Sequence, residues 1–155
     1  MYLGLKLLHV ISVVAFLGNI TTGLFWHAHA ARTRDPRLLA HTMDGILRSD
    51  RWFTNPAAAL IVITGILAAR EAQLPILHTP WIAGALGLFI VSGVLFVSRV
   101  TPLQKQMRAV AAAGLESAFD HGRYEALARQ WELWGAAALI TPLAALVLMV
   151  LKPGS

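Results

Sequence analysis

The residue with the clearest chemical potential in this sequence is His9, which lies inside an apolar run from Tyr2 to Trp26. A helix of about 20 apolar residues crosses a bilayer, and a titratable side chain inside it is costly unless it has a partner. On a helical repeat, the strongly polar or small positions fall on one side. The residues that share this side are His9, Ser12, Phe16, Asn19, Gly23 and Trp26. We therefore expect this side to face protein and His9 to bind a partner.

Two further residues, His78 and Met149, are expected in the same outer third of a helical bundle as His9. Imidazole and thioether groups are the usual axial ligands of a b-type haem, and a porphyrin between helices would satisfy a buried imidazole. The pattern favours haem b, with His9 as the ligand of the haem iron and His78 or Met149 as a second ligand. Alternatively, His78 is a solvated loop residue and Met149 is ordinary packing.

A second group of polar side chains is expected near the inner boundary, at similar depths in the first two spans. Such groups can form a site, or they can simply satisfy one another across the helices. The group consists of Asn19, Thr22, Thr54 and Asn55.

The other histidines give weaker signals. His27 and His29 are two residues apart, so on a helix their side chains point apart, and they share a metal only if the backbone is extended. His41 and His121 lie in charged segments and are expected to be solvated.

The composition indicates a single integral membrane domain over residues 1–155. Of the 155 residues, 57% are hydrophobic and only 14% are charged, which is too apolar for a soluble domain of this length. The absence of cysteine excludes thiolate metal sites, iron–sulfur clusters and disulfides. The net charge of +5 is scattered at the ends of apolar runs, so it indicates membrane topology and not nucleic-acid binding.

Four apolar segments predict an all-α, four-helix membrane bundle, with spans at about residues 3–26, 54–70, 80–99 and 131–151. Basic residues favour the cytoplasmic side, so both termini are expected outside and the long loops inside the bacterial plasma membrane. Ten of the thirteen basic residues lie in the first and third connections: Arg32, Arg34, Arg37, Arg48, Arg51, Arg99, Lys105, Arg108, Arg123 and Arg129.

Aromatic residues are expected to form belts at the two boundaries. Tyr2 and Trp81 would lie at the outer boundary, and Trp26, Trp52, Trp131 and Trp134 at the inner one. As an alternative for the N-terminus, Lys6 with the following apolar run and Ala28-His29-Ala30 resembles a signal peptide, although the run is longer than usual.

The connections also predict helices. Asp35 and Pro36 form a helix start, and the following segment predicts an amphipathic helix along the inner surface. Its solvent side would carry Arg37, Asp44, Arg48 and Asp50. The second span is expected either to begin near Pro56 or to be extended through a proline kink by Trp52 and Phe53. Pro102 is expected to restart an inner helix that Gly114 ends.

Five short motifs follow one another along nearly the whole chain. They resemble a functionally uncharacterised bacterial family of short four-span integral membrane proteins, and more distantly the J-type protoporphyrinogen oxidase, a membrane haem protein. The motifs are Leu5-Lys6-Leu7-Leu8-His9-Val10, Arg51-Trp52-Phe53-Thr54-Asn55-Pro56, Thr64-Gly65, Arg129-Gln130-Trp131-Glu132 and Val150-Leu151-Lys152-Pro153.

The resemblance implies that His9 is the axial haem histidine. The oxidase has a lysine early in its third span and a histidine near the end of that span, where this chain has Ile82 to Ala85 and Leu95 to Val97. These differences affect porphyrinogen oxidation more than haem binding. The resemblance therefore leaves open whether the chain is a membrane oxidoreductase, and its catalytic residues are unknown.

Three functions are compatible with these observations. The first is a haem b protein that transfers electrons or oxidises a small lipophilic substrate, with a quinone, a porphyrin or a redox protein as partner. The second is a cofactor-free scaffold or assembly partner. The third, a transporter of a small solute or metal, is the weakest because four spans without a repeat or a chain of carboxylates provide little for coupled transport. A homodimer could form through the glycine-lined third span.

Overall fold

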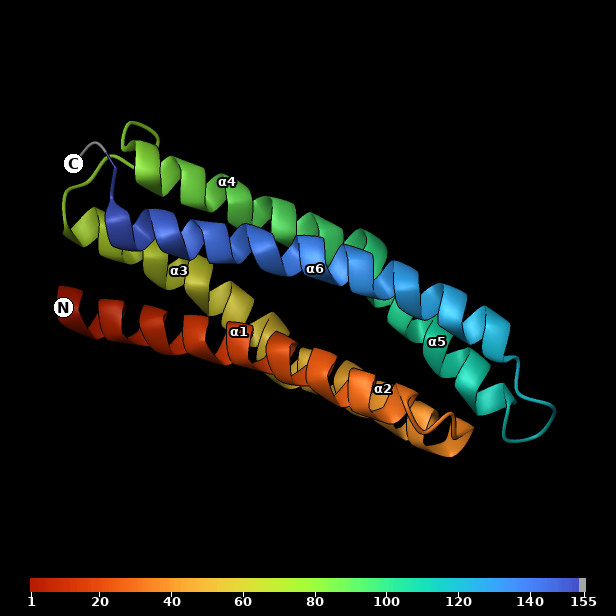
Figure 1. Cartoon of the computed structure of the whole chain (residues 1–155). Coiled ribbons are helices and arrows are strands. Elements are labelled where there is room, and N and C mark those ends of the chain that lie inside the picture. Colours follow the sequence, from red (N-terminus) through yellow and green to blue (C-terminus); the bar gives the residue numbers. More distant parts are fainter. Residues whose placement is uncertain (154–155) are drawn as a thin grey trace.

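The computed structural model describes residues 1–153, and these residues form helices and short connections without any strand. Figure 1 shows four long helical rods, and four helices are long and apolar enough to cross a membrane. The predicted all-α fold with four spans is therefore confirmed. The elements are α1 (Tyr2–Ala31), α2 (Pro36–Ser49), η1 (Asp50–Thr54), α3 (Asn55–Glu71), α4 (Pro80–Leu95), η2 (Phe96–Val100), α5 (Thr101–Ala113) and α6 (His121–Leu151).

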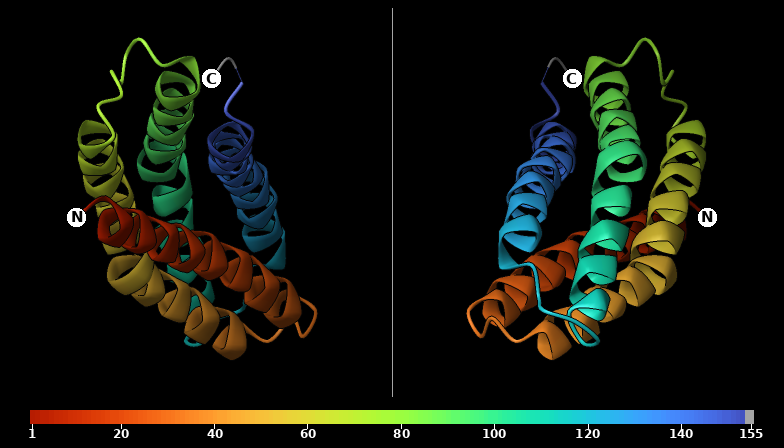
Figure 2. Two further views of the ribbon diagram at one scale, coloured as in Figure 1. Left: turned by 90° about the vertical axis from the view of Figure 1, so that its left-hand side faces the viewer. Right: turned by 90° about the vertical axis from the view of Figure 1, so that its right-hand side faces the viewer.

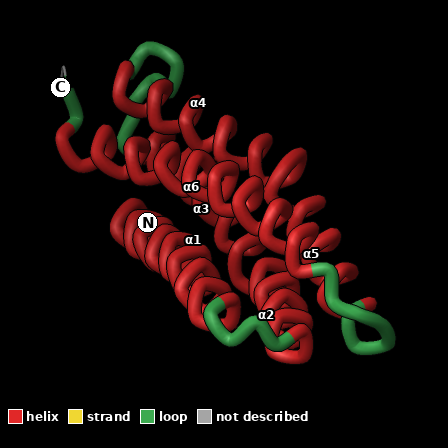
Figure 3. The backbone as a smooth tube through the Cα atoms, turned by 45° about the vertical axis from the view of Figure 1, so that its right-hand side comes forward, coloured by secondary structure: helices red, strands yellow, loops and turns green. Residues whose placement is uncertain are grey.

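The loops lie at the two ends of the rods (Figure 3). One end, called here the terminal end, holds both chain termini and the connection over residues 72–79 (Figure 1). The other, called here the loop end, holds the connections over residues 32–35 and 114–120. Along the terminal half α1 runs beside α3 and α4 beside α6, whereas at the loop end α2 packs on α5 and α5 on α6 (Figure 2).

The second and third rods each contain a π-helical turn just before a proline. The rod from Pro36 to Glu71 passes through η1 without a break, and Asn55 N–H donates to the carbonyl of Asp50. In η2, Thr101 N–H donates to the carbonyl of Phe96 in the same way. Proline lacks an N–H and clashes with the carbonyl four residues earlier, and a wider turn accommodates both problems.

The inner helix predicted from Pro102 to Gly114 is confirmed as α5, which begins at Thr101 and ends at Ala113. In the second span α3 begins at Asn55, beside Pro56, but the rod already includes α2 and η1 before it. The alternative, in which Trp52 and Phe53 extend the second span, is the one observed.

The main core lies at the loop end. Met43 of α2 and Met107 of α5 are completely buried there, together with Leu39, Ile46 and Trp131. A smaller cluster around Phe16, Ala57 and Ile61 joins α1 to α3 in the terminal half. The ring of Phe16 also meets that of Phe89 in α4, with centroids 5.4 Å apart.

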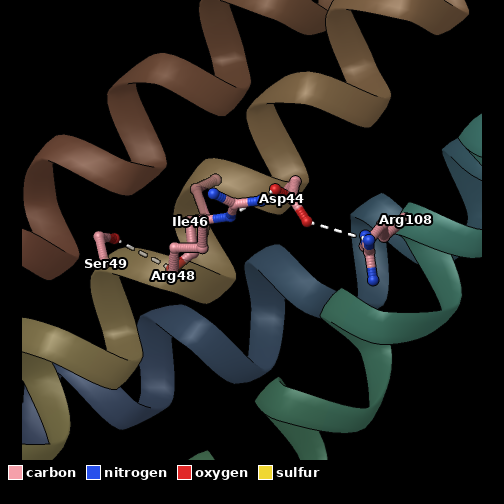
Figure 4. A network of polar contacts seen from close by, with 5 residues as sticks. All are labelled: Asp44, Ile46, Arg48, Ser49 and Arg108. Carbon is pink, nitrogen blue, oxygen red and sulfur yellow. Dashed lines mark hydrogen bonds and ion pairs between the residues drawn. The ribbon is translucent and has the colours of Figure 1, made fainter.

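The helix predicted after Asp35 is present, but its apolar side is covered by protein instead of lying on a membrane surface. Asp35 caps it by accepting from the backbone N–H of Arg37 at 2.8 Å. The apolar side is covered because Leu39, Met43 and Ile46 are buried in the core formed with α5. The helix then continues directly into η1 and α3. On its outer side, Asp44 lies 2.8 Å from Arg48 and 3.1 Å from Arg108 of α5 (Figure 4).

Many exposed apolar side chains lie on the four spans and are called here the apolar band. At the loop end the surface also carries exposed arginines such as Arg32 and Arg129. Of the tryptophans predicted for the inner belt, Trp26 and Trp52 are exposed, whereas Trp131 is only 3% exposed and belongs to the core. Exposed members of the band include Leu3, Leu7, Val14, Phe25, Ile63, Leu67, Ile90, Val94, Val97, Leu133, Ile140, Val147 and Val150.

Candidate functional site

The side chain of His9 lies against α3 in the terminal half of the bundle. Its Nδ1 is 3.0 Å from the carbonyl oxygen of Ile61 and 3.2 Å from the hydroxyl of Thr64, which donates to the carbonyl of Leu60. A carbonyl can only accept, so Nδ1 carries the proton and donates it to Ile61. A Cβ at Gly65 would lie 3.1 Å from Cε1 of His9, so a larger residue there would crowd the ring.

This hydrogen bond fixes the ring so that Nε2 is the free nitrogen. In a neutral ring with the proton on Nδ1, Nε2 carries the lone pair, and no residue among 1–153 forms a hydrogen bond with it. Metal-binding histidines are usually held in this way, with the other ring nitrogen donating to a carbonyl or carboxylate. His9 therefore fits the part of an axial ligand.

The described residues contain no group of three or more histidine, aspartate or glutamate side chains that could hold a metal ion. Haem iron takes only its axial ligands from the protein, because the porphyrin nitrogens fill its plane.

The two expected second ligands are not brought to His9 by any hydrogen bond or ring contact among the described residues. His78 is exposed in the connection between α3 and α4, where its backbone N–H donates to the carbonyl of Pro75 at 3.1 Å. Met149 is partly buried near the end of α6, which packs on α4. The connection that holds His78, the last turns of α6 with Met149 and the first turns of α1 with His9 belong to the terminal end (Figure 1).

A buried polar network lies near the middle of the molecule and is centred on Asp50. Its Oδ1 accepts from the hydroxyl of Thr54 at 2.7 Å and from Nδ2 of Asn19 at 3.3 Å. Its Oδ2 accepts from Nε2 of Gln104 at 2.9 Å, and Asn19 also donates to Thr54 at 2.8 Å. Asp50 is 7% exposed, so its expected place on a solvent-facing side is wrong.

The network contains two of the four residues of the expected polar group, Asn19 and Thr54, whereas Thr22 and Asn55 are exposed. Sequence reasoning missed Asp50 and Gln104. The spacing of Asp50 and Thr54 was an available signal, because residues four apart share a helix face.

A small cavity of about 30 Å³ borders this network and has room for roughly one water molecule. Gln104 and Trp131 both line it, and their Oε1 and Nε1 atoms are buried without a hydrogen-bond partner in the described part of the chain. Unpaired buried polar atoms are rare and costly, so these two atoms distinguish this region from an ordinary apolar core.

The other histidines lie at the loop end. His27 is buried, with Nε2 3.3 Å from the hydroxyl of Tyr124, whereas His29 is exposed beside Trp26. Because α1 is helical through Ala31, His27 and His29 point apart and do not form a shared metal site. His41 and His121 are exposed, as expected.

Comparison with known proteins places the chain in a family. The model of the family described as "Predicted integral membrane protein (DUF2269)" matches residues 3–153. No curated protein and no solved structure matches the chain. Because the family match covers almost the whole sequence and four helices are long and apolar enough to cross a membrane, the chain belongs to this family of integral membrane proteins.

Proposed function

We propose that the chain is a multi-pass protein of the bacterial plasma membrane that binds haem b through Nε2 of His9. The observation that carries this proposal is the 3.0 Å hydrogen bond from Nδ1 of His9 to the carbonyl of Ile61, which leaves Nε2 without a partner among the described residues. An imidazole in an apolar helix needs a partner on both nitrogens, and haem iron supplies the second.

The residues around His9 would orient the ligand. The carbonyl of Ile61 and the hydroxyl of Thr64 hold the imidazole, and Gly65 lets the ring lie close to α3. A bound haem would supply one-electron chemistry, suited to electron transfer or to oxidation of a small lipophilic substrate, with a quinone, a porphyrin or a redox protein as partner. Met149 or His78 would be the second residue that holds the haem.

The test is the optical spectrum of the full chain, produced in haem-replete cells and purified in detergent. We expect a red protein whose Soret band shifts on reduction with dithionite, and we expect His9→Ala to lose the band. His41→Ala is the matched control, since it removes an exposed imidazole at the loop end and should retain the band.

A second variant separates loss of the ligand from loss of folding. Gly65→Ala keeps His9 but places a Cβ 3.1 Å from its ring, so it should displace the imidazole and alter the reduced spectrum. Gly93→Ala, where nothing lies within 4 Å of the added Cβ, should leave the spectrum unchanged. A wild-type protein that stays colourless after reconstitution with haemin would overturn the proposal.

The cofactor-free scaffold is the second candidate, and one observation favours it. The hydrogen bond from His9 to α3 joins two membrane helices without any cofactor. In that case the purified protein is colourless, and His9→Ala lowers its melting temperature while His41→Ala does not.

A further inference from the structure

A cleft unrelated to the His9 site opens at the loop end of the bundle. It lies between the end of α1, α2 and the start of α6, and its volume is about 550 Å³. This volume is within the range of small-molecule sites, about 300–1,000 Å³. The cleft is therefore large enough for a ligand of several non-hydrogen atoms.

Two buried polar side chains form the floor of the cleft. His27 and Tyr124 line it, and they are only 1% and 3% exposed. Their side chains share a hydrogen bond of 3.3 Å, and their rings stack with an angle of 26° between the planes. Trp131 packs edge-on against His27 with ring centroids 4.8 Å apart, so the imidazole is held by aromatic rings on α6.

Three arginines also line the cleft. Arg32, Arg34 and Arg129 line the cleft, against two carboxylates, Glu125 and Glu132. Arg34 lies 3.8 Å from Glu125, and Glu132 lies 3.8 Å from Nδ1 of His27. The guanidinium groups of Arg32 and Arg129 form no ion pair with any residue among 1–153, so their N–H donors are available to a ligand.

The cleft lies just beyond the apolar band. Leu133, at 67% exposed, is the first strongly exposed apolar residue of α6 after Arg129 and Glu132. The guanidinium groups are therefore close to the level at which lipid phosphates end and the aqueous phase begins. Basic pockets between helices at this level are suited to anionic lipid head groups.

We propose that this cleft binds a phosphate group, with Arg32 and Arg129 as its main donors. The planar fork of a guanidinium matches two phosphate oxygens, and two such groups without carboxylate partners favour a dianion or a phosphodiester over a neutral ligand. The phosphate belongs either to an anionic lipid or to a soluble molecule, and both reach a cleft at this level.

The experiment measures binding to the full-length protein with two probes. Inorganic phosphate is titrated by calorimetry against the detergent-solubilised protein. Retained lipid is measured by native mass spectrometry after incubation with phosphatidylglycerol vesicles and, separately, phosphatidylcholine vesicles. The test variant is Arg32→Gln with Arg129→Gln. The control, Arg37→Gln with Arg51→Gln, removes the same charge from exposed arginines outside the cleft.

We expect the test variant to lose affinity by on the order of tenfold per guanidinium, since charge-assisted hydrogen bonds have this strength, and the control to lose little. If the protein retains phosphatidylglycerol and does not bind inorganic phosphate, the source of the phosphate group is a lipid. If inorganic phosphate binds and displaces the lipid, the source is a soluble ligand. Equal losses in both variants would show general surface charge and overturn the proposal. Wild-type protein that binds neither probe would overturn it as well.

Discussion

Individual residues show both what sequence patterns can find and where they fail. His9 stood out because an imidazole in an apolar helix is costly unless it has partners. Its hydrogen bond to the carbonyl of Ile61 supplies a partner for one of the two ring nitrogens. Asp50 was missed because it lies between Arg48 and Arg51, in a stretch whose charges were expected to be solvated. Charge alone does not reveal which side of a helix a neighbouring helix will cover.

The depth of a residue can be predicted from an apolar run, but its direction around the helix cannot. Asn19 and Thr54 were grouped with Thr22 and Asn55 because all four have similar depths. Only the first pair is joined by a hydrogen bond, of 2.8 Å, while the second pair is exposed. Each successive residue turns by about 100° around a helix, so neighbours in sequence point to different surroundings.

The residue-scale prediction concerns the stability of the Asp50 network. Asp50→Ala leaves donors on Asn19, Thr54 and Gln104 without their acceptor, so we expect it to lower the free energy of unfolding by about 3 kcal/mol. Asp44→Ala is the control, because its partners Arg48 and Arg108 are solvent-exposed and such pairs contribute about 0–1 kcal/mol. Thermal unfolding in detergent compares them, and equal losses would contradict a special role for Asp50.

At the scale of the elements, the prolines lie at helix starts as expected, but they do not interrupt the rods. Pro56 and Pro102 lie in the first turns of α3 and α5, and each of these helices follows a π-helical turn inside an uninterrupted rod. The rods are packed on both sides of the prolines, since α2 and α5 share a core with α6 while α3 packs on α1. Such tertiary contacts lie outside what a local sequence pattern contains.

The element-scale prediction tests whether η1 is a one-residue widening of the rod. Deletion of Phe53, combined with Pro56→Ala to remove the ring clash, should convert the wide turn to α-helix and keep the faces of α2 and α3 aligned. Deletion of the exposed Ala59 in the same background removes a residue from regular helix and rotates one flank by about 100°. We expect a monodisperse, cooperatively melting protein only from the Phe53 deletion, as judged by size exclusion and circular dichroism. The reverse result would show that η1 is not such a turn.

For the whole molecule, the four spans and the fold class followed from apolar length and composition. The pairing of the helices could not be predicted, because helices that are apolar on most sides carry little information about which neighbour each side meets. In the structure α1 pairs with α3 and α4 with α6, and the loop ends close into one core. This arrangement puts the His9 site in the apolar half and the arginine-lined cleft at the opposite end.

The molecular-scale prediction concerns the orientation of the protein, that is, which side of the membrane each end faces. Ten of the thirteen basic residues lie in two segments, residues 32–51 and 99–129, that contain the loop-end connections and the helices next to them, so this end should be cytoplasmic and the terminal end outside. The chain has no cysteine, so single cysteines report their own position without a background. Glu71→Cys lies at the end of α3 and Glu116→Cys in the connection between α5 and α6, and both positions are exposed.

In intact spheroplasts, a membrane-impermeant maleimide should label the cysteine at position 71, and it should label the one at position 116 only after the membrane is permeabilised. Each substitution removes one negative charge, so their effects on the charge balance are matched. The opposite labelling pattern would place the His9 site in the inner leaflet half and the cleft outside. In that orientation a soluble phosphate ligand of the cleft would have to come from outside the cell.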